Sequence, residues 1–249
     1  MSQQAAFEGA GPIRAGHELP LDRLADWLRR HAPALGELRD VRQFNGGQSN
    51  PTYRLETDTG ACVLRRKPAG AVLKGAHAVE REFRVLSALR QADFPAPRPL
   101  ALCEDEAVIG SPFYLMEMVE GRIFWSPTLP DLTPRDRADH FDALNATIAR
   151  LHALDVSAIG LGDYGRPGNF FARQIARWSR QYLEDDLAGR DPNMDRLLAW
   201  LPEHAPPDDG AVSLTHGDFR TDNAVFASDR AEVRAVLDWE LSTLGHPMG

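Results

Sequence analysis

The pattern of the chain changes near residue 120, and this change most limits the folds that the chain can adopt. Between residues 41 and 118, short β-type segments alternate with turns that carry glycine or proline, around one helical stretch. Beyond residue 121, apolar residues recur mainly at helical spacing. We therefore expect an α+β fold of two lobes, with a small antiparallel-sheet lobe followed by a mainly helical lobe.

The expected domains are a flexible tail over residues 1–16, an N-terminal lobe over 17–119 and a C-terminal lobe over 120–249. Leu21, Leu24 and Leu28 recur at helical spacing before Pro33, which predicts a first helix. Strands are expected at 41–44, 52–57, 61–65, 100–102, 113–118, 211–214 and 233–237, and further helices at 76–90, 141–151 and 171–182.

Composition excludes several classes of protein. Hydrophobic residues make up 43% of the 249 residues, which is enough for a real core. No apolar run suits a signal peptide or a membrane span, and two cysteines are too few for a disulfide framework, so we expect a cytoplasmic protein without a membrane partner. The net charge of -8 disfavours nucleic acid as a partner, because such binding needs a basic surplus.

The residues most indicative of chemistry lie in Leu214-Thr-His-Gly-Asp-Phe-Arg-Thr-Asp-Asn223 and in Asp238, which follows a predicted strand. Phosphoryl transfer from ATP needs a carboxylate that deprotonates the acceptor hydroxyl and hard oxygen ligands that hold magnesium. Asp218, Asn223 and Asp238 supply this set at the spacing of the kinase pattern H-R-D-x-x-x-x-N and of the aspartate of D-F-G. The alternative is that the aspartates only cap turns.

His216 is assigned a supporting role in the same loop. The base must be the group nearest the acceptor, and His216 lies two residues before Asp218 on the strand side. We expect its imidazole to hold the loop by hydrogen bonds.

The sequence resembles the aminoglycoside phosphotransferase and choline-kinase-type small-molecule kinases, most closely the branch whose kinase-like domain is fused to acyl-CoA dehydrogenases in some animals. The resemblance spans nearly the whole chain. It implies a protein-kinase-like two-lobed fold, ATP and Mg²⁺ as cofactors, and transfer of the γ-phosphoryl group to a hydroxyl. The segments that carry it are 45–50, 62–65, 77–86, 114–121, 216–223 and 235–245.

The resemblance also implies roles for individual residues. Asp218 corresponds to the catalytic base, and Asn223 and Asp238 to the magnesium ligands. The backbone of the glycine loop, Gly46, Gly47, Gln48 and Ser49, is expected to cover the phosphates. The connector between the lobes, Glu117, Met118 and Val119, is expected to contact the adenine edge.

At the position of the phosphate-binding lysine on the third strand this chain has Arg65. Val63 and Arg65 share a strand face, and the guanidinium suits phosphate and carboxylate together. Lys67 has the same parity and is the alternative. Glu82 is the expected carboxylate partner, because it falls inside the apolar stripe of the following helix, where a charge is costly unless paired; a solvated Glu82 at the edge of the stripe is the other interpretation.

Three interpretations of function follow. The first is a small-molecule kinase whose acceptor is aminoglycoside-like or a hydroxyacyl thioester; we favour the latter because of the branch resembled. The second is a kinase-like nucleotide-binding module with weak or no catalysis, since Arg65 replaces lysine. The third is a protein kinase, but the sequence lacks the G-x-G-x-x-G, H-R-D and A-P-E patterns of that class.

Eleven residues follow Asp238, where relatives continue with helices, so we expect a fragment of a longer chain.

Overall fold

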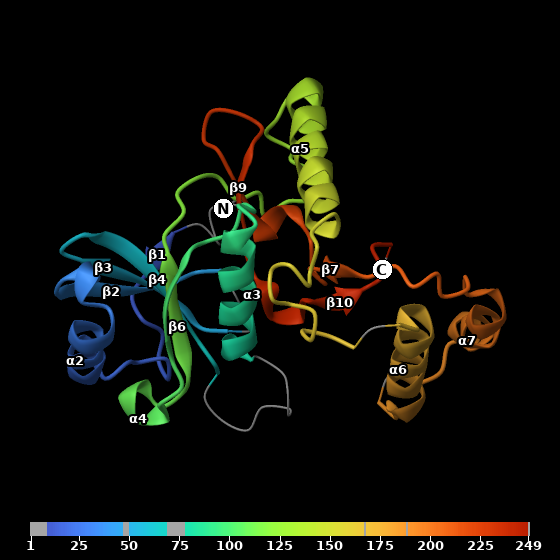
Figure 1. The fold of residues 1–249 in the computed structure, drawn as a ribbon, viewed down its shortest axis with the longest axis horizontal. Helices are drawn as coiled ribbons and strands as arrows, with labels where there is room; N and C mark the ends of the chain where they lie inside the picture. Colours follow the sequence, from blue (N-terminus) through green and yellow to red (C-terminus); the bar gives the residue numbers. More distant parts are fainter. Residues whose placement is uncertain (1–8, 47–49, 69–77, 167, 188, 249) are drawn as a thin grey trace. The chain divides into compact units, whose positions relative to one another are not determined.

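The computed structural model describes residues 9–46, 50–68, 78–166, 168–187 and 189–248 (Figure 1). These residues form two compact units. The first unit comprises residues up to 150 together with 217–241, and the second comprises 151–216 together with 242 onward. Each unit is described by itself.

The first unit contains a sheet of six strands in the order β1-β2-β3-β4-β6-β5, with every neighbouring pair antiparallel. Its strands are β1 (Ala10–Gly11), β2 (Leu38–Phe44), β3 (Thr52–Thr57), β4 (Gly60–Arg66), β5 (Pro99–Cys103) and β6 (Phe113–Glu117). Asp58 and Thr59 form the tight turn between β3 and β4, after which Gly60 takes a φ of 125°. Glycine tolerates such a positive φ without strain.

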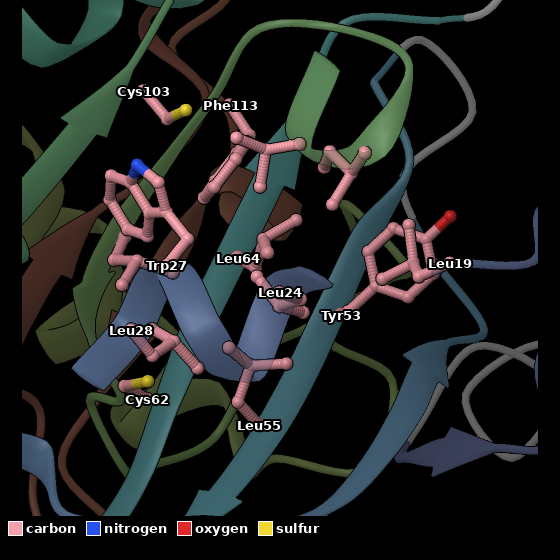
Figure 2. Packing of buried hydrophobic residues seen from close by; sticks show 13 residues of the cluster. Leu19, Leu24, Trp27, Leu28, Tyr53, Leu55, Cys62, Leu64, Cys103 and Phe113 are labelled. Atoms are coloured by element: carbon pink, nitrogen blue, oxygen red, sulfur yellow. The ribbon is translucent and has the colours of Figure 1, made fainter. Parts of the chain in front are cut away.

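Two helices pack on this sheet. Leu24, Trp27 and Leu28 of α2 (Leu21–His31) are buried against strand residues such as Leu55 and Leu64 (Figure 2). Side chains alternate along β4, so Val63 and Arg65 point to the opposite face. The helix α3 (Val79–Gln91) contacts the sheet through β5 and β6.

Further elements complete the first unit. The short helix α4 (Glu106–Ile109) precedes β6, and the long helix α5 (Pro134–His152) follows the connector. Residues 217–241 contribute the 3-10 turn η2 (Thr221–Asn223), the hairpin of β8 (Ala224–Phe226) and β9 (Val233–Val236), and the 3-10 turn η3 (Trp239–Leu241). A further 3-10 turn, η1 (Pro33–Leu35), follows α2.

The second unit holds α6 (Phe170–Glu184), α7 (Pro192–His204) and a two-stranded sheet of β7 (Ser213–Thr215) and β10 (Thr243–Gly245). Neither α6 nor α7 has a fully buried residue, and Trp178 and Trp200 are each about half exposed. Its helical content matches the expectation for this part of the sequence.

The elements expected from the sequence are found with shifts of one to three residues at most ends, but α5 begins at Pro134, seven residues before the expected start. The helices α4 and α7 and the strands β1, β8 and β10 were not expected. Ala10 and Gly11, which the sequence places in a tail, pair with Phe44 and Gln43 of β2. The expected boundary at residue 119 also differs from the observed units, because residues 120–150 and 217–241 group with the sheet.

Among the described residues, no helix is long and apolar enough to cross a membrane.

The two thiols are predicted to be unreactive in the native protein. Cys62 and Cys103 are 1% and 3% exposed, and burial raises the pKa of Cys62 to about 11. At pH 8 only about one thiol in a thousand would then be thiolate, the nucleophilic form. We expect a thiol-reactive disulfide reagent to titrate both cysteines quickly in denaturant and far more slowly without it. Fast native labelling of Cys62 would contradict the packing of α2 on β4.

Candidate active site

A hairpin brings Asn223 and Asp238 to one place. Strands β8 and β9 pair antiparallel, with Ala224 opposite Val236, so the residue before β8 and the residues after β9 lie at the same end. The Leu237 N–H donates a hydrogen bond of 2.8 Å to the Asn223 carbonyl, which extends this pairing. Two polar side chains separated by fifteen positions in the sequence are thereby placed on adjacent backbone segments.

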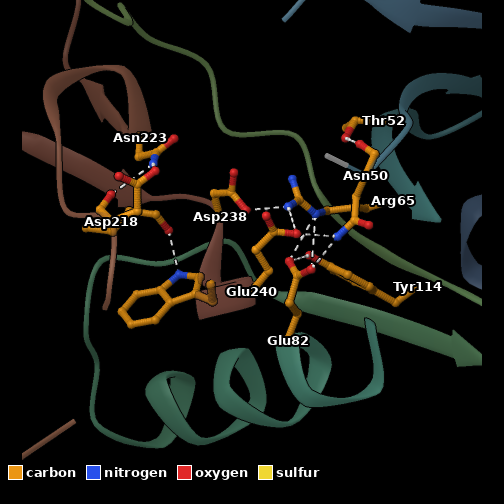
Figure 3. Close-up of polar contacts among 11 residues, drawn as sticks. Asn50, Thr52, Arg65, Glu82, Tyr114, Asp218, Asn223, Asp238 and Glu240 are labelled. Atoms are coloured by element: carbon orange, nitrogen blue, oxygen red, sulfur yellow. Dashed lines mark hydrogen bonds and ion pairs between the residues drawn. The ribbon is translucent and has the colours of Figure 1, made fainter. Parts of the chain in front are cut away.

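The loop before the hairpin is closed by Asn223. Its amide Nδ2 donates to the Asp218 carbonyl at 2.9 Å and to the Asp218 carboxylate Oδ2 at 3.1 Å (Figure 3). Arg220 pairs with Asp218 Oδ1 at 3.1 Å. Because the Asn223 side chain uses its nitrogen for both bonds to Asp218, its carbonyl oxygen is directed away from Asp218. The Asp218 side chain is held in one orientation and stays one-third exposed.

Glycine is required at residue 217. Its φ is 86°, and a Cβ there would lie 2.6 Å from the Leu241 carbonyl oxygen. A larger residue would be strained in conformation and would also collide with backbone. The glycine of the H-G-D segment therefore permits close packing of the Asp218 loop on η3.

Asp238 itself has a φ of 63°, a region that few residues other than glycine adopt. The next residue, Trp239, is 1% exposed, donates from Nε1 to the Val236 carbonyl at 2.9 Å, and packs edge-on against Phe94. Strained backbone of this kind persists where the surroundings determine it, and it is concentrated at functional sites.

The guanidinium of Arg65 lies among three carboxylates. Arg65 Nε is 3.0 Å from Glu82 Oε2, and Nη2 forms an ion pair with Asp238 Oδ1 and lies 3.7 Å from Glu240 Oε2 (Figure 3). Tyr114, opposite Arg65 in the register of β4 and β6, donates its hydroxyl to Glu82 Oε2 at 3.0 Å. The cluster joins the sheet, α3 and η3.

Burial and charge act in opposite senses on this cluster. Burial raises the pKa of the Glu82 carboxyl to about 7, although Arg65 opposes that rise. Burial works to lower the pKa of Arg65, but Glu82 and Asp238 outweigh it and raise the pKa above its usual value. Arg65 is therefore charged at any physiological pH, and Glu82 is the member whose charge is costly.

The oxygen atoms available here suit a hard cation. Arg65 occupies one oxygen of Asp238, and the other has no partner among the described residues. Asn223 offers its carbonyl oxygen from the adjacent segment. Magnesium in nucleotide sites is commonly held by one or two carboxylates together with phosphate oxygens and waters. The residues present therefore fit Mg²⁺ bound with a nucleotide, although no group of three or more His, Cys, Asp or Glu in the described part of the chain is arranged to hold a metal by itself.

Comparison with known proteins decides the family. The model of the phosphotransferase enzyme family matches residues 40–248. The chain belongs to this phosphotransferase family. Acyl-CoA dehydrogenase family member 10 of Mus musculus is 44% identical over 240 residues, which is 95% of this chain and 22% of the relative. The probable acyl-CoA dehydrogenase IBR3 of Arabidopsis thaliana is 49% identical over 219 residues, 84% of this chain and 27% of the relative.

The chain thus spans about a quarter of the length of these two relatives. Among solved structures, a Ralstonia eutropha protein described provisionally as an aminoglycoside phosphotransferase superposes with a TM-score of 0.82 at 48% identity, over 93% of this chain and 68% of that one. A mutant of aminoglycoside phosphotransferase APH(4)-Ia in ternary complex with ADP and hygromycin B gives 0.61 at 16% identity, over 90% and 73%. The fold is the kinase-like fold of these phosphotransferases, as expected, and the acyl-CoA dehydrogenase branch is confirmed as the source of close relatives.

The structure locates the other residues that the family resemblance singled out. Gly46 is buried, and a Cβ there would collide with the Trp125 ring; Gly47, Gln48 and Ser49 lie outside the described residues. Glu117 ends β6, and its N–H donates to the Arg98 carbonyl at 2.9 Å, whereas Met118 and Val119 follow in the half-buried connector.

His216 and Lys67 are located as well. His216 is 2% exposed at the end of β7, in the second unit. Lys67 follows β4, and its N–H donates to Pro112. Its side chain forms no ion pair with Glu82 or any other carboxylate in the described part of the chain.

Three residues of the cluster around Arg65 were not singled out by sequence reasoning: Asn50, Tyr114 and Glu240. Tyr114 could have been found, because its position directly across from Arg65 follows from pairing the two strands. Glu240 follows Asp238 by two residues and adds a second carboxylate there. Asn50 ends the glycine loop and carries no local pattern that indicates its contacts.

The Arg65 cluster yields a prediction on charge and shape. Arg65→Ala leaves Glu82 buried and unpaired, which should lower the free energy of unfolding by about 3 kcal/mol. Arg65→Lys keeps a point charge near the phosphates and should be tolerated far better. Glu82→Gln removes a charge that burial penalises, so it should reduce phosphoryl transfer more than it reduces stability. Urea unfolding and nucleotide-dependent activity measure the two effects. Equal behaviour of Arg65→Lys and Arg65→Ala in both assays would contradict this assignment.

Proposed function

We propose that this chain transfers the γ-phosphoryl group of ATP to a hydroxyl of a small molecule. The observation that carries the proposal is the arrangement of the hairpin: Asn223 orients Asp218 and lies beside the segment that ends in Asp238, which in turn contacts the strand cation Arg65. A general base, oxygen ligands and a phosphate-binding cation thus belong to one compact unit.

Each residue has a defined role in this mechanism. Asp218 accepts the proton of the acceptor hydroxyl as its oxygen attacks the γ-phosphorus, and the bond from phosphorus to the ADP oxygen breaks. Asn223 fixes the carboxylate of Asp218 and, with Asp238, would hold Mg²⁺. When bound, that ion neutralises charge on the phosphates. Arg65 would bind phosphate oxygens while Glu82 orients its guanidinium.

The remaining residues support nucleotide binding in the proposal. The backbone N–H groups of residues 46–49 would cover the phosphates, and the connector Glu117 to Val119 would contact the adenine edge. His216 would hold the catalytic loop from its buried position. These roles rest on the family resemblance.

For the acceptor we propose a hydroxyacyl thioester in preference to an aminoglycoside. Support comes from the acyl-CoA dehydrogenase names of relatives at 44% and 49% identity, whereas the complex with hygromycin B belongs to a protein at 16% identity. A panel of hydroxyacyl thioesters and aminoglycosides, assayed for ATP-dependent phosphorylation by this chain, tests the choice. Phosphorylation of aminoglycosides alone would overturn it.

A second candidate function is a nucleotide-binding module with weak or no catalysis. The observation in its favour is Arg65 at the lysine position, engaged with the proposed metal ligand Asp238. ATP binding without phosphoryl transfer to any acceptor, and without ATP hydrolysis above that of Asp218→Asn, would support this second candidate.

Asp218→Asn should lower kcat roughly 10²- to 10⁴-fold, because it removes the general base, while ATP affinity stays within a few-fold. A matched control is Asp222→Asn, since Asp222 lies in the same loop and pairs with Arg220 at 3.0 Å. The control should retain most of the activity. Near wild-type kcat in Asp218→Asn would show that Asp218 is not the base.

Asp238→Ala should weaken binding of ATP in the presence of magnesium, because a carboxylate oxygen is lost from a cation with few protein ligands. The control is Asp229→Ala, in the exposed turn of the same hairpin, where the side chain is 75% exposed. Calorimetric titration of both variants at saturating magnesium measures the effect. Equal affinities in wild type and Asp238→Ala would remove Asp238 from the metal site.

A further inference from the structure

Asn50 links two carboxylates from distant parts of the chain. Its side chain is completely buried, just before β3, and its Nδ2 donates to Glu82 Oε1 at 3.0 Å and to Glu240 Oε2 at 2.9 Å (Figure 3). An amide nitrogen carries two hydrogens, and these two bonds use both. Glu82 is on α3 and Glu240 is in η3, 190 residues after Asn50.

The amide lies where like charges approach each other. Glu82, Asp238 and Glu240 surround one guanidinium, that of Arg65. Asn50 approaches Glu240 more closely than Arg65 does, at 2.9 Å against 3.7 Å. A donor shared by two carboxylates offsets their mutual repulsion, and without it Glu240 is repelled from Glu82.

The contact with Glu240 bears directly on Asp238. Asp238 has the unfavourable φ of 63°, so its conformation depends on its neighbours. Trp239 is fixed by its indole bond to Val236 and by burial, and Glu240 is bonded to Asn50. The turn that presents the Asp238 carboxylate is therefore held at the two residues that follow it.

The two polar atoms of the Asn50 side chain differ in their contacts, and the nitrogen Nδ2 makes the hydrogen bonds. The oxygen Oδ1 is buried and has no hydrogen-bond partner among the described residues. The contacts that the structure gives this amide are therefore the two bonds that its nitrogen donates to Glu82 and Glu240.

We propose that Asn50 is a positioning residue for the magnesium ligand: by holding Glu240 against Glu82, it fixes the Asp238 turn relative to α3 and to the end of the glycine loop. This inference rests on the proposed function, because it assigns Asp238 to the metal. Asn50 acts through Glu240 and touches neither ATP nor the reacting hydroxyl in this role.

The experiment measures the ATP dissociation constant by calorimetry, with magnesium chloride and with a chelator, for wild type and five variants. These are Asn50→Ala, Glu240→Ala, Glu240→Gln, the double variant Asn50→Ala with Glu240→Ala, and the control Gln43→Ala. Gln43 is a buried amide in the same sheet that bonds to Arg14 and His17, away from the cluster.

Asn50→Ala and Glu240→Ala should each weaken ATP binding with magnesium about tenfold or more, as loss of outer-shell partners of a metal ligand commonly does. Binding in chelator should change by less than about twofold, since the metal ligand has no role there. The double variant should lose less affinity than the product of the two single losses, because the two residues share one contact. Glu240→Gln keeps an oxygen that accepts from Asn50, so it should retain more affinity than Glu240→Ala. Gln43→Ala should retain the wild-type magnesium dependence.

Three results would overturn the positioning role. One is an unchanged ratio of the two dissociation constants in Asn50→Ala, another is multiplicative loss in the double variant, and the third is a Glu240→Gln variant as weak as Glu240→Ala. Should Asn50→Ala not fold, the comparison of Glu240→Ala with Glu240→Gln decides. Absence of magnesium-dependent ATP binding in the wild type would instead reject the proposed function, and the role of Asn50 with it.

Discussion

The ion pairs of the buried Arg65 guanidinium join the sheet of the first unit to α3 and to the segment that carries Asp238. Arg65 extends from the face of β4 opposite the α2 core and meets carboxylates from α3 and from the segment after β9. Three carboxylates around a single cation are stable only while that cation is present, because a buried and unpaired carboxylate is strongly penalised. The position of Asp238, the orientation of Glu82 and the contacts of Asn50 all depend on this charge.

Backbone geometry supplies the second constraint. The antiparallel pairing of β8 and β9 sets Asn223 beside Leu237. The positive φ of Gly217 and its lack of a Cβ let the Asp218 loop approach Leu241 closely. Both features are made by contacts within the chain itself, so the entropy of ordering these groups is lost during folding. Preorganised groups of this kind require little rearrangement when a substrate binds.

Much of this arrangement could be predicted from the sequence. The apolar spacing of Leu21, Leu24 and Leu28 predicted α2, and a charged residue within the apolar stripe of α3 indicated that Glu82 would be buried and paired with Arg65. What could not be predicted has physical reasons. Strands of three residues such as β8 and β10 are too short to show a period, and α4 is a single turn whose cap at Asp105 resembles an ordinary turn. The contacts of Asn50 join residues 190 positions apart, and no local pattern encodes them.

The arginine on β4 has a consequence for chemical modification. The only two side-chain amines of the chain are those of Lys67 and Lys74, whereas the cation in the carboxylate cluster is a guanidinium. A guanidinium stays protonated and is a poor nucleophile, so acylating reagents and lysine acetylation act on amines and leave it intact. The central charge of this site is consequently out of reach of the acyl-transfer chemistry that can silence a lysine-based phosphate site, including spontaneous acylation by reactive thioesters.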